Sequence, residues 1–417
     1  MTQWSPIWNV EIDGVSYTDA VLANLTIRSG RTNIYEQPQA GYVNLQLLDV
    51  NQTAIPVAIN STVSVSVEDS TGTPQVLFGG NVVDIGLEVR DVGTTMFTQT
   101  YSITALGALA RLPKVIFTDA LARDYDGDQI YEVLQSVLFN SWAQVGGALT
   151  WGSYFPTTTW ADAENSGLGV IDRPGNYDLA ARGGGQDPID VYSLVSALAT
   201  SGLGYLFECA CGLINYADST HRTNYLSANG YVDLDANHAR AAGLRIETRV
   251  GDVRNAITIK YGATSSSDVS ASDAASIATY GNLSQVITTT LHDATDANDQ
   301  AAFYLSLRAQ PQPIFSEISF DLTNPEIDDA DRDSLINVFM GEAISLNNLP
   351  LNMNSGTFQG FVEGWSFQAS YNRLSVTLLM SPLAYSLQAM RWNDVPVTET
   401  WASVSPTLEW QYATIVA

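Results

Sequence analysis

The chain carries FGGNV at Phe78–Val82 and, far downstream, FQGFV at Phe358–Val362, two copies of the pattern Phe-x-Gly-x-Val. The neighbouring segments match in the same order: Thr62–Val65 with Ala343–Leu346 before the pattern, then Tyr101–Leu106 with Leu374–Leu379 and Ala108–Leu112 with Pro382–Leu387 after it. A single pentapeptide match can arise by chance, but matched blocks in the same order and spacing favour duplication. We therefore predict two related β-domains.

Gly80 and Gly360 hold the same position in the two copies. A glycine inside a strand weakens it, so it usually marks a bulge or a place where another backbone approaches closely. We expect a side chain at either position to obstruct that contact.

Alternation of apolar and polar residues is typical of strands that bury one face. Residues 8–109 show it in short runs at Trp8–Ile12, Tyr42–Leu47, Val63–Val67, Val82–Val89 and Phe97–Ala105. It returns near residue 244 and continues in runs at Ala256–Tyr261, Phe315–Leu322, Ala343–Leu346, Phe358–Phe367 and Leu374–Leu379. The chain is therefore predicted to be mainly β, with two related antiparallel β-barrel domains.

Between these two regions the spacing of apolar residues becomes helical. Asp128 can cap a helix in which apolar residues of Ile130–Leu138 share one face. Asp187 and Pro188 open a second predicted helix, Ile189–Thr200, because Pro suits the first helical turn and Asp its cap. We predict a mixed α/β insert between the β-domains.

Three further patterns complete the organisation. Tyr205–Ala217 is predicted to form a hairpin, Thr264–Ser276 is a low-complexity run predicted to be a mobile loop, and Ala294–Gln310 has helical spacing. We predict four parts: 1–113, the first β-barrel domain; 114–245, the α/β insert domain; 246–387, the second β-barrel domain with a helix at about 294–310; and 388–417, an extended C-terminal arm.

Acidic residues outnumber basic ones, with 44 Asp and Glu against 18 Lys and Arg and a net charge of -26. Binding of DNA requires cations that neutralise phosphates, so this composition excludes sequence-specific nucleic-acid binding. The most apolar stretch, Val191–Ala217, contains several glycines and Glu208, which a membrane-spanning helix of about 20 residues does not readily carry. No membrane span is predicted.

The compartment is predicted from the amino terminus and the cysteines. Met1–Pro6 has neither the basic segment nor the apolar run of a secretory signal. Cys209 and Cys211 are too close along one strand to bridge readily, so reduced thiols are expected. The chain is expected to fold in a cytoplasm.

Asp124, Asp126 and Asp128 resemble the opening of a calcium-binding loop, whose oxygen ligands recur at alternate positions. The match then ends, because Gln129 and Gln135 stand where that loop needs Gly and Glu. A helix cap is the favoured interpretation.

Zinc and catalytic motifs are no better supported. Cys209, Cys211, His221 and His238 are zinc-type ligands, but a one-residue gap between the cysteines suits a hairpin more than a zinc site. The chain has no Gly-x-Ser-x-Gly, and none of its histidines stands near an evident nucleophile in sequence. We predict no catalytic, metal or cofactor-binding residues.

Tryptophans outside the strongest strand patterns are the remaining candidates for contacts. Trp392, Trp401 and Trp410 lie in a Pro-containing segment without helical or alternating pattern, and large aromatic anchors typically fill pockets on a partner. We predict that these three contact a neighbouring subunit or this chain's own surface. Trp151 and Trp160 are candidate sugar-stacking residues.

Several phrases along nearly the whole chain resemble minor tail proteins of long-tailed bacteriophages. They are Val10–Val15, Leu25–Arg31, Gln37–Tyr42, Phe78–Gly80, Ile103–Leu112, Tyr216–Arg222, Gly251–Ala256 and Gly360–Trp365. None is a catalytic motif, so their number and order carry the resemblance. The family resembled is the tail or baseplate hub, whose subunit carries two related β-barrel domains plus inserted α/β material.

The resemblance implies a structural virion protein rather than an enzyme. Such a hub is a homotrimer at the distal end of the tail, where two β-domains in each of three subunits match the six-fold tail tube. The implied partners are other copies of the chain, the tail tube or distal tail protein, the tape measure protein, and tail fibre or tip proteins. About 30 residues follow the second β-domain, which leaves no room for a peptidoglycan-cleaving domain.

Two other classes of function stay open at this point. A carbohydrate-binding tail adhesin would use Trp151 and Trp160, and glycan binding by an isolated monomer would favour it. A glycoside hydrolase needs a pair of carboxylates, which a chain with 44 acidic residues always offers at some separation. The loss of activity after one acid-to-amide change would identify the hydrolase.

Overall fold

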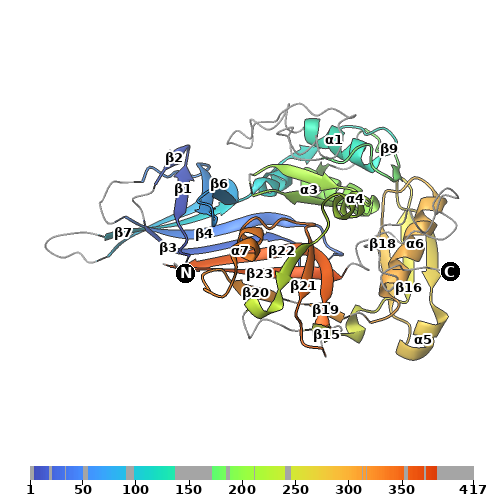
Figure 1. Ribbon diagram of the computed structural model, residues 1–417. Helices are drawn as coiled ribbons and strands as arrows, with labels where there is room; N and C mark the ends of the chain where they lie inside the picture. Colours follow the sequence, from blue (N-terminus) through green and yellow to red (C-terminus); the bar gives the residue numbers. More distant parts are fainter. Residues whose placement is uncertain are drawn as a thin grey trace.

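The computed structural model describes residues 4–17, 21–32, 34–49, 55–90, 98–136, 171–184, 188–210, 212–239, 246–311, 313–315, 317–351, 356–370 and 372–382. Figure 1 shows a large sheet that fills one side of the molecule, with a smaller group of helices and strands from residues 256–308 at the opposite end. The helices of the insert lie along the upper side of the figure. The predicted mainly β fold with helical insertions is confirmed.

The first β region follows the predicted alternation. Its strands are β1 (Trp8–Ile12), β2 (Val15–Ser16), β3 (Val21–Gly30), β4 (Gln39–Asp49), β5 (Thr62–Glu68), β6 (Pro74–Arg90) and β7 (Thr98–Leu106). Along β4 every second side chain is fully buried, as period two requires of a strand with one face on the core. The strands pair in the order β3-β4-β7-β6-β5-β1-β2.

The second β region is built from strands further along the chain. They are β14 (Val232–Asp235), β15 (Ile246–Thr248), β19 (Pro313–Phe315), β20 (Ile318–Asp321), β21 (Ala343–Asn347), β22 (Phe358–Ser370) and β23 (Arg373–Pro382). β14 pairs with β21, β21 with β22, β22 with β23 and β23 with β20, while β15 pairs with β19.

Twelve of these strands form one sheet, because β3 of the first region pairs antiparallel with β22 of the second, while β15 and β19 form a separate two-stranded sheet. Gly30 lies opposite Gly364 at one end of this pairing, and Asn24 lies opposite Ser370 at the other. The described strands contain no closed barrel, so the predicted barrel arrangement is not observed. Alternation predicts which face of a strand is buried, but it does not determine which other strand pairs with it.

Strand register shows that the two copies of the repeat are structurally equivalent. Val63 lies opposite Gly80 in the β5–β6 pair, and Ile344 lies opposite Gly360 in the β21–β22 pair. The next strand pair of each copy, β6–β7 and β22–β23, contains a register shift two residues after the glycine. The shift lies between Val82 and Asp84 in β6 and between Val362 and Gly364 in β22. The repeat therefore preserves pairing and bulge alike.

The register also corrects one detail of the sequence match. Leu106 lies opposite Asn81, and its counterpart opposite Phe361 is Ser381 rather than Leu379. The error is two residues, a shift that keeps every side chain on the same face of the sheet. The equivalence extends to the next strand, because Leu45 lies opposite Ile103 in the first copy and Ile318 lies opposite Leu378 in the second. The outer strands differ between the copies: β1 is antiparallel to β5, whereas β14 is parallel to β21.

The insert contains helices and short hairpins. Its elements are η1 (Ala108–Lys114), β8 (Ile116–Phe117), β9 (Asp124–Tyr125), α1 (Asp126–Ser136), β10 (Asp178–Leu179), β11 (Ile189–Asp190), α3 (Val191–Ser201), β12 (Tyr205–Glu208), β13 (Ile214–Ala217), α4 (His221–Asn229) and η4 (Ala236–His238). The predicted hairpin is present as β12 and β13. The second predicted helix begins two residues late, because residues 189 and 190 pair with β8 and the Asp190 side chain accepts the Ser193 N–H at 2.9 Å.

A third group of elements follows β15. It contains η5 (Val250–Asp252), β16 (Ala256–Tyr261), β17 (Ser267–Ser272), α5 (Ala274–Tyr280), β18 (Ser284–Thr288) and α6 (Ala294–Arg308). The helix predicted at about 294–310 is confirmed, with Asp293 as its cap. The loop predicted at Thr264–Ser276 is wrong in part: β17 pairs with β16, and the Asp273 side chain caps α5. α7 (Asp329–Ile336) lies in the second β region.

Buried apolar side chains form two large clusters. One combines the two β regions, and it includes Val43, Ile103 and Phe367. The other combines the insert with residues 257–301, and it includes Leu198 and Ile257. The four-part division of the chain stays a prediction.

Cys209 is disulfide-bonded, so the expected reduced thiol is wrong at this position. β12 ends at Glu208, and the Gly212 N–H donates to the Cys209 carbonyl at 3.0 Å, so Cys209 lies in the turn rather than on a strand. Side chains in a turn no longer alternate between opposite faces. Cys211 lies outside the described residues.

No described helix is both long and apolar enough to cross a lipid bilayer.

Candidate interaction site

A buried carboxylate joins three parts of the chain. Glu363 lies on β22, is 2% exposed, and accepts hydrogen bonds from Arg31 Nε at 2.6 Å and from Arg222 Nη1 and Nη2 at 2.7 and 2.9 Å. Arg31 follows β3 in the first β region, and Arg222 lies on α4 in the insert. The Ser381 hydroxyl donates a further bond to Glu363 at 2.5 Å. Glu363 therefore connects both β regions and the insert.

The charges of this cluster are fixed by their arrangement. Burial opposes ionisation of Glu363, but Arg222 and Arg31 outweigh it and lower the pKa of the carboxyl to about 2. Glu363 is therefore ionised at neutral pH, and it neutralises charge that would otherwise be buried without a partner.

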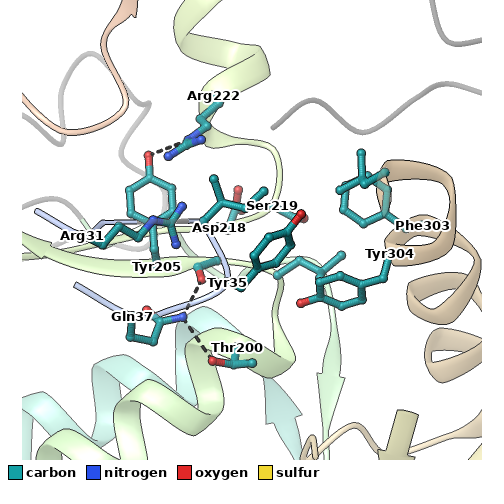
Figure 2. A pocket seen from close by; sticks show the side chains of 14 residues that line it. Arg31, Tyr35, Gln37, Thr200, Tyr205, Asp218, Ser219, Arg222, Phe303 and Tyr304 are labelled. Atoms are coloured by element: carbon teal, nitrogen blue, oxygen red, sulfur yellow. Dashed lines mark hydrogen bonds between the residues drawn. The ribbon is translucent and has the colours of Figure 1, made fainter. Parts of the chain in front are cut away.

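Tyr205 packs between the two arginines (Figure 2). The guanidinium carbons of Arg31 and Arg222 lie 5.0 and 4.7 Å from the centre of its ring, and Arg222 Nε donates to its hydroxyl at 3.3 Å. Beside it, Gln37 Nε2 donates to Thr200 Oγ1 at 3.2 Å and to the Gly204 carbonyl at 3.0 Å. These polar groups bind one another across the junction.

The cavity at this junction measures about 80 Å³ and is lined by aromatic and polar residues, among them Tyr35, Tyr205, Asp218 and Tyr304. Sites for small organic ligands usually measure about 300–1,000 Å³. The cavity is too small for a sugar ring without movement of its walls, so its lining residues serve the contact between parts of the chain.

A second cavity of about 680 Å³ lies beside the first. Three arginines line it, Arg249, Arg254 and Arg308, together with three carboxylates, Glu36, Asp252 and Glu363. Arg308 is 5% exposed, its guanidinium carbon lies 3.8 Å from the centre of the Tyr35 ring, and its Nε donates to the Asp252 carbonyl at 3.2 Å. Pro382, where β23 ends, also lines the cavity.

Glu208 attaches the insert to the first β region. Its carboxylate accepts the Leu109 N–H at 2.8 Å and the Gly41 N–H, so it binds the start of η1 and the edge of β4 together. Burial raises the pKa of this carboxyl to about 7, although the backbone donors act in the opposite direction.

Asp126 has a structural role within the insert. It is the first residue of α1 and accepts the N–H groups of Asn176 and Tyr177, both at 2.8 Å, and the Tyr216 hydroxyl at 2.5 Å. Burial raises the pKa of Asp126 to about 6, against the hydrogen bond from Tyr216. Asp128 instead pairs with Arg173. Asp126 and Asp128, which the pattern of a calcium-binding loop would offer as ligands, therefore bind groups of the protein itself.

The candidate zinc ligands that the structure describes do not converge. His221 Nδ1 lies 2.7 Å from Asp172, and His238 Nδ1 lies 2.7 Å from Asp331. His238, Asp331 and Asp328 do place donor atoms within 4.8 Å of one another. Asp328 caps α7 by accepting the Asp331 N–H, so this cluster is accounted for by hydrogen bonds between η4 and α7.

The repeat glycines have matching surroundings. A Cβ atom added to Gly80 would lie 2.3 Å from the Leu106 carbonyl oxygen and 2.7 Å from the Phe78 ring. A Cβ atom added to Gly360 would lie 2.3 Å from the Ser381 carbonyl oxygen and 2.9 Å from the Phe358 ring. In each copy the glycine therefore lies against the equivalent backbone oxygen and the equivalent phenylalanine.

The structure does not test the predicted tryptophan contacts. Trp392, Trp401 and Trp410 lie outside the described residues, as do Trp151 and Trp160. Their roles stay predictions.

Sequence reasoning missed the most heavily bonded residues of the site, Glu363, Arg31, Arg222 and Glu208. Their partners lie far apart along the chain, so sequence spacing does not bring them together. Two signals were available in the sequence. Arg31, Arg222 and Glu363 lie in segments that carry the family resemblance, and Glu208 interrupts the most apolar stretch of the chain.

Comparison with known proteins shows which class of protein shares this fold. No family model and no curated protein sequence matches the chain. A solved tail protein from Neisseria meningitidis matches with a TM-score of 0.58 and 10% identity, over 92% of this chain and 98% of that one. The 43 kDa tail protein of prophage MuSo2 from Shewanella oneidensis matches with a TM-score of 0.54 and 10% identity, over 91% of this chain and 99% of that one.

The chain therefore has a bacteriophage tail protein fold over nearly its whole length, as the sequence resemblance predicted.

Proposed function

We propose that the chain is a structural subunit of a phage virion tail, and that three copies form a hub at the distal end of the tail. The fold shared with two tail proteins over nine-tenths of the chain supports a structural tail role. The duplicated strand unit carries the trimer proposal, because two equivalent units in each of three subunits give six positions around an axis. A hub of this kind would match a six-fold tail tube.

The proposed hub joins the tail tube or distal tail protein to tip proteins or fibres and surrounds the DNA exit channel. The net charge of -26 supports this position, since a negative wall repels phosphates and would not retain passing DNA. The tape measure protein, which lies within the tube, is a further proposed partner. The chain would be assembled into the virion in the cytoplasm of the host bacterium.

No observation favours the adhesin or the hydrolase over this proposal. Asp126 and Glu208, two buried carboxylates whose pKa is raised, are bound to backbone and hydroxyl donors inside the chain. The proposal therefore assigns the chain no enzymatic activity.

Mass photometry of the purified chain tests the oligomeric state directly. We expect a species with three times the 45.0 kDa mass of one chain at micromolar concentration. A monomer at every concentration, together with binding of isolated monomers to cell-surface glycans, would contradict the hub and support the adhesin.

A further inference from the structure

The two β regions have equivalent strand edges, and only the edge in the second region is covered by another described strand of the same chain. In the second unit the outer half of β22 is covered by β3, with residues 364–370 opposite residues 24–30. In the first unit the equivalent half of β6 begins at Asp84 and pairs with β7 on one side. On its other side, no described strand pairs with the backbone of Asp84–Leu87. An edge of this length invites pairing with another chain.

The side chains along these two edges show the same contrast. Trp365, Phe367 and Ala369 on β22 are 5%, 1% and 5% exposed. The equivalent positions on β6 are Ile85, Leu87 and Val89, which are also apolar, but Ile85 is only half-buried and Leu87 and Val89 are 56% and 45% exposed. Apolar side chains at equivalent positions indicate that β6 also has a cover in the assembled protein.

The counterpart of β3 in the second unit is the segment that ends in β15. The register makes Leu45 equivalent to Ile318, and three residues earlier along the chain Tyr42 corresponds to Phe315. Tyr42 lies opposite Arg28, and Phe315 lies opposite Ile246. Ile246, Glu247 and Thr248 therefore correspond to Arg28, Ser29 and Gly30 of β3. Among the described strands, β15 pairs only with β19, so its second edge has no strand partner there.

We propose that β15 of one copy pairs antiparallel with β6 of the next copy, as β3 pairs with β22 inside each chain. The register within the chain assigns Glu247 opposite Ile85 of the neighbouring copy, and Ile246 opposite Gly86 of that copy. This contact is head-to-tail, and repetition around three copies lets every β unit cover the next one. The inference rests on the proposed trimer and assigns the strands that hold it together.

Charges at one end of this contact are complementary. Arg31 follows Gly30 and binds Glu363 on the strand that β3 covers; Arg249 stands in the equivalent place after Thr248 and is exposed. The proposed register brings Arg249 next to Asp84 of the neighbouring copy, an exposed carboxylate on β6. Opposite charges at such a position favour the correct partner and register.

The contact between copies differs from the one within the chain at its first residue pair. Gly30 and Gly364 approach so closely that added Cβ atoms would lie 2.3 Å and 2.8 Å from backbone oxygens of the opposite strand. Thr248 and Asp84 replace them and carry side chains. The strands of two copies must therefore separate further there, so the closest pairing begins at Glu247 and Ile85.

Disulfide cross-linking of full-length chains tests the register. A chain carrying both Ile85→Cys and Glu247→Cys should give a reducible covalent trimer on mild oxidation, because opposite residues in antiparallel strands have Cβ atoms about 4.5–5.5 Å apart. The matched control carries Leu87→Cys with Glu247→Cys, which moves one partner by two residues on the same face. We expect at least tenfold less cross-linked product from the control.

A second variant tests the edge without cysteines. Leu87→Asp should abolish trimers by mass photometry at micromolar concentration and leave the monomer folded, whereas Val286→Asp, at an equally exposed apolar residue on β18, should leave the trimer intact. A wild-type trimer that gives no in-register cross-link and tolerates Leu87→Asp would overturn the strand assignment alone. A wild-type chain that never trimerises would overturn the proposed function together with it.

Discussion

Glu363 is the residue through which both β regions and the insert are joined by ion pairs. Its carboxylate is the shared partner of Arg31 and Arg222, and all three side chains are at most 6% exposed. Glu363→Gln would leave two guanidiniums buried beside a neutral amide. Breaking a buried ion pair on one side costs about 3–5 kcal/mol.

Chemical denaturation followed by circular dichroism measures this loss. Glu326→Gln, an exposed glutamate of the second β region, is the matched control and should change the free energy of unfolding by less than about 0.5 kcal/mol. Equal stability of the two variants would show that the cluster does not hold the junction.

The repeat glycines give a second prediction at this scale. Gly80→Val and Gly360→Val should each lower the free energy of unfolding by about 1–3 kcal/mol, because the new side chain must displace a backbone oxygen and a phenylalanine ring. Gly184→Val, whose added Cβ would meet its nearest atom, Ala120 Cβ, at 3.7 Å, serves as the control. Unchanged melting temperatures for both glycine variants would reject the equivalence argument.

Glu342 predicts how stability depends on pH. Burial raises the pKa of this carboxyl from 4.5 to about 8, so the folded chain holds a proton that the unfolded chain releases between these values. Its contribution to stability is complete below pH 4.5 and is lost as the pH rises toward 8. Glu342→Gln should therefore flatten the fall in stability between pH 5 and 8 by up to about 1.4 kcal/mol per pH unit. Parallel denaturation curves across that range would contradict the assignment.

At the scale of elements, local pattern and local chemistry were sufficient for some features and not for others. The strands around Gly80 and Gly360, the β12–β13 hairpin and α6 were predictable, because alternation, turn residues and the Asp293 cap all act within a few residues. The pairing of β3 with β22 was not, since it joins residues more than 300 positions apart and depends on backbone groups that every strand offers. The low-complexity run failed as a guide because Asp273 caps a helix inside it.

The predicted C-terminal arm is also an element-scale feature. Truncation after Gln388 should leave a folded chain but weaken trimerisation or attachment to the tail, because Trp392, Trp401 and Trp410 are predicted to anchor on a neighbour. Size measurement and circular dichroism melting of the truncated chain check this. A large loss of melting temperature in monomeric protein would mean that the tryptophans cover this chain's own core, and normal assembly would mean that they are dispensable.

For the whole molecule, the central claim is that one chain supplies two of six equivalent positions around a tail axis. The two copies of the repeat share strand register and bulge, and β3 links them inside the chain, which supplies two equivalent units for the proposed ring. Direct imaging of the purified, unmodified protein by electron microscopy tests this claim. We expect a closed ring with three-fold symmetry and six similar lobes. A particle of any other symmetry, or a monomer under conditions that preserve the fold, would contradict it.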